Sequence, residues 1–192
     1  TQYLQYSLRF TPLQTGLRIL PIAAAMLLGA LSAPRLIDHL RLKRTVLFGL
    51  GCVAAGFGWL ATATTESTFG QVLPGALLFG LGAGLLVPAA TQAVMDSLPA
   101  DAAGTGSATN TALMQVGSAL GVAVIGSLLA ARYRHIMMTS PLWPQLGQWQ
   151  SAALESVAGA LRAARQLPAE LANQLSALAV HGFVAGMRLA LL

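Results

Sequence analysis

Long stretches without a charged side chain constrain this sequence more than any other feature. Residues 67–95 and 102–131 contain none, and neither do residues 45–65 or 19–34. A helix needs about 20 mainly apolar residues to cross the hydrocarbon core of a bilayer. Backbone polar groups in lipid must be satisfied within the segment itself, so these stretches predict membrane-spanning helices.

Four complete spans are predicted within residues 16–131. They cover residues 16–34, 45–63, 71–93 and 106–129. The expected fold class is therefore all-α, a polytopic bundle of membrane helices.

The rest of the chain differs from these four spans. Residues 1–15 are expected to hold the end of an earlier span and an outer loop, with an aromatic rim formed by Tyr3, Tyr6 and Phe10. Residues 132–180 are expected to form a long outer loop, in which residues 151–166 and 168–180 show weak helical amphipathicity. Residues 181–192 are expected to begin a last, truncated span, because an apolar run of this length rises only about half a bilayer. We interpret the chain as a fragment of a larger membrane protein.

Composition excludes several classes of protein. Only 9% of the residues are charged and 55% are hydrophobic, whereas soluble domains carry about 25% charged residues. A soluble enzyme and a disordered segment are both excluded on this ground. The net charge of +5 does not predict a nucleic-acid partner, because the basic residues are scattered except in residues 35–44. Basic residues this dense in a short loop favour the cytoplasmic side.

Residues capable of catalysis or metal binding show no useful spacing. Cys52 is the only cysteine, and the three histidines lie far apart in sequence, at positions 39, 135 and 181. We therefore expect no metal and no cofactor. No nucleophile motif surrounds any serine, so an enzyme is not expected.

Helix 106–129 holds the best candidates for a pathway or a packing face. At 100° per residue, Gly106, Gly117 and Gly121 lie within about 40° of Asn110, and Gln115 lies further round the same side. Two interpretations remain open here. The small residues favour close helix packing, whereas the polar side chains of Asn110 and Gln115 suit a polar pathway or hydrogen bonds between helices.

A second glycine-rich run, residues 80–84, lies within the third span. It lacks the preceding strand and the flanking lysine of a phosphate-binding loop. We therefore interpret it as a site of close helix packing.

The basic segment resembles a known motif. Residues 34–44 (PRLIDHLRLKR) are similar to the loop pattern G-x-L-a-D-R-x-G-R-R/K of the major facilitator superfamily. Leu36, Asp38 and the basic pair Lys43 and Arg44 agree with it. Among its departures from the pattern, the two glycines and the basic residue after Asp are replaced by Pro34, Arg41 and His39.

Other segments narrow the resemblance to one family. Residues 1–21, with TQYLQ, TPLQTG and LP, and residues 103–126, with AGTGSATNT and QVGSALGVAVIG, resemble the 14-helix drug:proton antiporters of the EmrB/QacA type. The resemblance implies that the chain is part of the C-terminal half of a major facilitator fold. It also implies that Asp38, Arg41, Lys43 and Arg44 belong to a cytoplasmic gate, and that the coupling carboxylates lie in the N-terminal half.

The implied function is proton-driven efflux of hydrophobic or amphiphilic drugs by alternating access. The expected partners are the lipid bilayer, the substrate, protons and a periplasmic adaptor protein, with the protein in the bacterial cytoplasmic (inner) membrane. A carrier for another small solute is an alternative, because one fold serves many substrates. A membrane scaffold subunit that does not transport is another.

Overall fold

The computed structural model describes residues 11–65, 67–97, 99 and 103–191. The predicted aromatic rim of Tyr3, Tyr6 and Phe10 lies outside the described residues. Every regular element in the described parts is a helix, and four of these helices are long and apolar enough to cross a membrane. The prediction of an all-α bundle of membrane helices is confirmed.

The first three helices begin and end at recognisable sequence signals. They are α2 (Pro12–Leu40), α3 (Leu42–Leu60) and α4 (Phe69–Asp96). At the start of α2, the hydroxyl of Thr11 accepts from the Gln14 amide at 3.3 Å, and the Gln14 side chain accepts from the Thr11 amide at 3.2 Å. The start of α4 repeats half of this arrangement, because the Gln71 side chain accepts from the Thr68 amide at 3.0 Å. These bonds satisfy amides that have no partner inside the helix.

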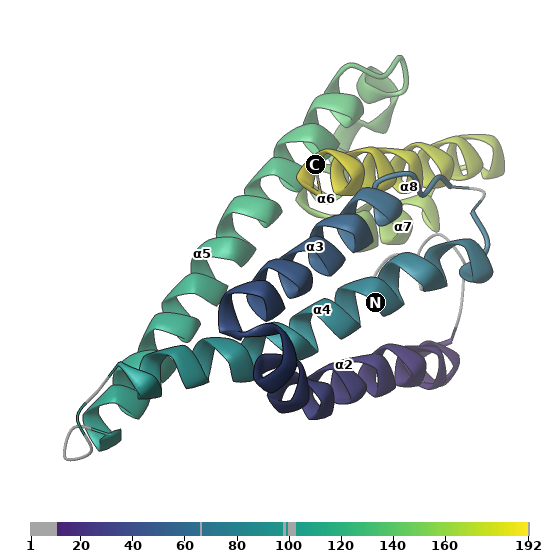
Figure 1. Ribbon diagram of the computed structural model, residues 1–192. Coiled ribbons are helices and arrows are strands. Elements are labelled where there is room, and N and C mark those ends of the chain that lie inside the picture. Colours follow the sequence, from purple (N-terminus) through teal and green to yellow (C-terminus); the bar gives the residue numbers. More distant parts are fainter. Residues whose placement is uncertain (1–10, 66, 98, 100–102, 192) are drawn as a thin grey trace.

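The helix α4 lies between α2 and α3 and packs along both (Figure 1). The long helix α5 (Ala103–Met138) runs obliquely away from these three. Near one end it contacts α4, and towards the other it contacts α8. Most residues between 111 and 128 are exposed, so the middle of α5 has no packing partner in the described part of the chain.

The C-terminal residues form a second packed group. It contains a 3-10 helix, η2 (Trp143–Trp149), followed by α6 (Gln150–Glu155), α7 (Val157–Ala164) and α8 (Ala169–Leu191). The largest fully buried side chains of the group are Met137, Leu146 and Leu175. The hydroxyl of Tyr133 donates to the carbonyl of Ala153 at 2.8 Å and ties α5 to α6.

The structure corrects the predicted boundary at residue 181. The last helix begins at Ala169 and continues to Leu191, and it is one of the four helices that could cross a membrane. The helix is continuous because no glycine or proline interrupts residues 169–181, and His181 does not stop it.

Two other predicted helix boundaries differ from those in the structure. Residues 151–166 form two helices, because Ser156 adopts an extended backbone and its hydroxyl caps α7 by accepting from the Gly159 amide at 3.0 Å. The helix predicted at 106–129 extends to Met138. A charged residue such as Arg132 ends an apolar stretch but does not end a helix.

Residues 45–63 are predicted to be a membrane span, and most of them lie in the helix α3. This helix is not one of the four that are long and apolar enough to cross a membrane. That helix has 19 residues and begins at Leu42 with Lys43 and Arg44 in its first turn. Because the helix is so short, any stretch of it long enough to cross a membrane includes both charges. Whether α3 crosses the bilayer stays a prediction.

Candidate functional site

The glycines of α4 allow it to approach α2 closely. A Cβ atom on Gly80 would lie 2.8 Å from the carbonyl oxygen of Ile22, and one on Gly84 would overlap the carbonyl of Met26. Only a residue without a side chain fits at these distances. Gly80 and Gly84 are four residues apart and therefore share one face of the helix.

Another glycine face of α4 meets α3. A Cβ on Gly82 would lie 2.6 Å from the carbonyl oxygen of Gly49, and one on Gly75 would lie 3.0 Å from that of Gly56. The interpretation of the run 80–84 as a packing site is confirmed. Close backbone contact of this kind is how small residues hold membrane helices together, since lipid supplies no hydrophobic driving force between them.

Asn110 joins α5 to α4. Its side chain is 9% exposed, and its Nδ2 donates to Thr91 Oγ1 at 3.3 Å. The Thr91 hydroxyl in turn donates to the carbonyl of Val87 at 3.0 Å. Gly106, one turn before Asn110, is buried as well. Asn110 therefore makes a hydrogen bond between helices, and its role in a pathway stays a prediction.

The remaining candidates on α5 lie further along the helix and face open space. Gln115 and Gly117 are exposed and Gly121 is half-buried. A Cβ on Gly117 or on Gly121 would meet no atom within 4 Å. The described chain therefore brings no helix against these glycines, and their role in packing or in a pathway stays a prediction. Burial does not distinguish the glycine side of α5 from its apolar side. Leu113 and Leu120, on the apolar side, are exposed as well.

The basic segment is a helix junction and not a loop. The helix α2 runs to Leu40 and α3 begins at Leu42, so Arg41 alone separates them. The side chains of Asp38, Arg41, Lys43 and Arg44 are all exposed, and among the described residues Asp38 forms no ion pair with the other three. The role of these residues in a gate stays a prediction.

Arg41 has an unusual backbone conformation at this junction. Its φ of 69° and ψ of 150° make it the only non-glycine residue with positive φ in the described part of the chain. Its amide donates to the Ile37 carbonyl at 2.9 Å, and its own carbonyl accepts from the Arg44 amide at 3.1 Å. It thus caps both helices. The motif in the first subsection has glycine at this position, and this backbone region is one that glycine occupies readily and other residues occupy at a cost.

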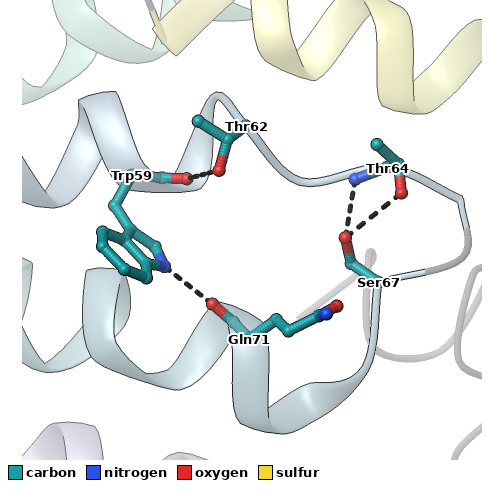
Figure 2. A pocket seen from close by; sticks show the side chains of 5 residues that line it. All are labelled: Trp59, Thr62, Thr64, Ser67 and Gln71. Carbon is teal, nitrogen blue, oxygen red and sulfur yellow. Dashed lines mark hydrogen bonds between the residues drawn. The ribbon is translucent and has the colours of Figure 1, made fainter.

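A polar pocket of about 440 Å³ lies where α3 turns into α4 (Figure 2). Trp59 borders it and donates from Nε1 to the Gln71 carbonyl at 2.7 Å. The Ser67 hydroxyl accepts from the Thr64 amide at 2.9 Å and lies 3.2 Å from the Thr64 hydroxyl. The polar groups drawn here mainly bond to one another, so the pocket is best explained by the turn between the two helices.

Arg188 has a partner that the sequence did not predict. In the structure Arg188 Nε donates to the carbonyl of Ala61 at 2.7 Å. Ala61 is the C-cap of α3, where the carbonyls have no partner within the helix and the helix dipole favours a cation. The sequence signal was a basic residue near the C-terminal end of an apolar helix. It could not identify the partner, because Ala61 is remote in sequence.

The described residues contain no cluster of three or more His, Cys, Asp and Glu that could hold a metal ion. Cys52 is half-buried and forms no disulfide. The polar chemistry of the described chain is therefore that of hydrogen bonds between helices and of exposed basic groups.

Comparison with known protein families shows to which family the chain belongs. The sequence model of the Major Facilitator Superfamily matches residues 1–139. The chain belongs to the major facilitator superfamily. As a member of this superfamily of transporters, it is a multi-pass membrane protein, and its fold is that of an all-α membrane bundle.

Curated relatives within the superfamily carry names of resistance and export proteins. The chain is 30% identical to the tetracenomycin C resistance and export protein of Streptomyces glaucescens, over 99% of the chain and 36% of that protein. It is 28% identical to the multidrug efflux pump LfrA of Mycolicibacterium smegmatis, over 97% of the chain and 37% of the pump. It is 35% identical to the multidrug resistance protein Stp of Mycobacterium tuberculosis, over 68% of the chain and 24% of that protein. The matched parts of the chain thus cover between 24% and 37% of the length of these three relatives.

Proposed function

We propose that this chain is part of an efflux transporter that exports hydrophobic or amphiphilic compounds in exchange for protons. The observation that carries the proposal is the similarity of nearly the whole chain to a named export protein and a named efflux pump. These two relatives extend well beyond the matched region. We therefore propose that the chain supplies one part of a 14-helix protein, within its C-terminal half.

In this proposal the tightly packed helices act as one body during transport. The glycine contacts hold α4 against α2 and α3 too closely for these helices to slide past one another. Alternating access requires such rigid groups to rock about a central site. The uncovered middle of α5, which contains Gln115 and Gly117, is where the remaining helices or the transport pathway would meet this part.

We further propose a bacterial inner-membrane location, with the junction at Arg41 on the cytoplasmic side. The dense basic residues around it support this orientation. The bilayer, the exported compound and protons are then the partners, and a periplasmic adaptor protein is a further partner of the complete transporter. In this arrangement the helices α6 and α7 lie on the outer side.

The function is tested by dye accumulation in bacterial cells that lack their own main efflux pumps. Expression of the complete protein should lower the steady-state accumulation of ethidium relative to empty vector, and a protonophore should abolish the difference. Normal membrane levels of the protein without any change in accumulation, over a panel of amphiphilic cations, would contradict efflux. If export persists in the presence of the protonophore, the proposed proton coupling is wrong, whereas the proposed efflux still holds.

The gate role of the basic segment has its own test. Asp38→Asn removes one negative charge beside Arg41 and Lys43 and should reduce dye efflux while the protein still inserts. Asp96→Asn, at the end of α4, is the matched control because Asp96 is also an exposed carboxylate at a helix terminus. An exposed ion pair is worth only about 0–1 kcal/mol, so equal efflux by wild type and Asp38→Asn would leave Asp38 as a solvated surface charge.

A further inference from the structure

An apolar cavity of about 200 Å³ lies at the end of the bundle where α3 ends and α4 begins. Three helices form most of its wall, through Ile19 and Ile22 of α2, Phe69 and Val72 of α4, and Met187 and Leu191 of α8. It is smaller than the roughly 300–1,000 Å³ of sites for whole drug-sized molecules. A cavity of this size and lining therefore suits one apolar segment of a larger ligand.

The level of the cavity in the membrane follows from its neighbours. Trp59, at the C-terminal end of α3, is 50% exposed, and tryptophan is enriched where the bilayer meets water. Arg18 lies about 9 Å along α2 from Pro12 at 1.5 Å per residue. These features suit a cavity at the depth where a lipid headgroup gives way to its acyl chains.

Two guanidinium groups flank the cavity. The Cζ atom of Arg18 lies 5.5 Å from the centroid of the Phe69 ring, which lines the cavity. Arg188 follows the lining residue Met187 and is held at the end of α3 by its bond to Ala61. Guanidinium groups bind phosphate oxygens with strong, charge-assisted hydrogen bonds. Their presence favours an anionic ligand over a hydrophobic cation.

A buried hydroxyl lies on the same side of α2. Thr15 is 2% exposed, and its Oγ1 has no hydrogen-bond partner among the described residues. It stands one turn before Ile19, a lining residue, so the two share a helix face. Buried hydroxyls almost always have a partner, so one hydrogen bond remains unmade on the helix face beside the cavity.

We propose that this cavity binds one acyl chain of an anionic phospholipid, with the lipid phosphate held by Arg18 and Arg188. The apolar wall, the flanking cations and the interfacial depth all match the chemistry of such a lipid. The proposal concerns a lipid bound at the outside of the helix group and is independent of what the protein transports.

The test uses the complete protein purified in detergent and a phosphatidylglycerol with two long acyl chains. This lipid should raise the melting temperature of the wild type, and native mass spectrometry should detect a tightly bound copy. A diacylglycerol with the same chains, which lacks the phosphate, should bind about fivefold more weakly, or worse, for each arginine contact that is lost. Inorganic phosphate, which has no acyl chain, should leave the melting temperature unchanged.

Variants separate this site from the exposed basic junction at Arg41, which also attracts anionic lipids. Ala76 lines the cavity, so Ala76→Leu should fill it and remove most of the shift caused by phosphatidylglycerol. Ala24→Leu is the matched control, since Ala24 is exposed on α2, and it should keep the full shift. Arg18→Gln should weaken lipid binding without closing the cavity, so the proposal stays testable if Ala76→Leu folds poorly.

Three results would overturn the proposal. The first is an undiminished lipid shift in Ala76→Leu together with normal binding in Arg18→Gln. The second is equal binding of the diacylglycerol and of phosphatidylglycerol. The third is displacement of the lipid by a hydrophobic cation such as tetraphenylphosphonium, which would assign the cavity to a ligand of opposite charge.

Discussion

Arg188 Nε of α8 donates a hydrogen bond to the carbonyl oxygen of Ala61 at the end of α3, across 2.7 Å and 127 residues of sequence. This contact connects the C-terminal helix group to the group formed by α2, α3 and α4. It places a cation at the negative end of the α3 dipole and satisfies a carbonyl that the helix itself leaves open.

Replacing Arg188 with methionine should lower the stability of the protein. The long apolar stem is kept, whereas the charged hydrogen bond is lost, at a cost of about 1 kcal/mol. The measurement is thermal unfolding in detergent. Arg162→Met is the control, because Arg162 is exposed on α7, and an equal loss in both variants would show that the bond to Ala61 contributes nothing.

The glycine contacts of α4 predict opposite effects of one substitution at two sites. Gly82→Ala would place a Cβ 2.6 Å from the Gly49 carbonyl and should destabilise the protein by about 1–3 kcal/mol through overpacking. Gly51→Ala on α3 meets no atom within 4 Å and should stabilise it by about 0.5–1 kcal/mol through helix propensity. Melting temperatures in detergent test both changes. Similar effects at the two positions would mean that α4 and α3 do not touch at Gly82.

The bond from Asn110 to Thr91 predicts coupling between these two residues. In a double-mutant cycle of Asn110→Ala and Thr91→Val, the two losses of stability should be less than additive, by about 0.6 kcal/mol, as for other hydrogen bonds between membrane helices. Additive losses would mean that the bond does not form. Gln115→Ala should leave stability unchanged, because Gln115 is exposed, and any loss of efflux in that variant then reports on a pathway role.

Arg41→Gly should stabilise the junction between α2 and α3. Glycine adopts φ 69° and ψ 150° without the steric cost of a Cβ, so the expected gain is about 1 kcal/mol in thermal unfolding. Arg44→Gly removes the same charge inside the first turn of α3 and should cost about 1 kcal/mol. If both variants are destabilised alike, the backbone at Arg41 is not strained.

The proposed orientation is tested by cysteine labelling. In a background with Cys52→Ser, a cysteine at Leu42 should be protected from an impermeant thiol reagent added to whole cells, and a cysteine at Gln148 should react. The basic residues that are dense around Leu42 favour the cytoplasmic side for it. Protection of Gln148 and labelling of Leu42 would invert the orientation.

The helical class and the membrane setting were readable from the sequence because both depend on local properties. A long run without charge, such as residues 67–95, can only satisfy its backbone in lipid as a helix. The packing role of the run from Gly80 to Gly84 was readable for a similar reason. Closely spaced glycines in an apolar helix have few uses other than backbone contact.

Other features depend on residues that are remote in sequence, and only the tertiary structure decided them. No local pattern pairs Arg188 with Ala61 or Asn110 with Thr91, because each partner lies on a different helix. The start of the last helix at Ala169 was missed because hydropathy locates apolar runs, whereas backbone hydrogen bonds continue through polar residues such as His181. The cavity beside Phe69 exists only where α2, α4 and α8 meet, since side chains from three separate segments must come together to enclose a space.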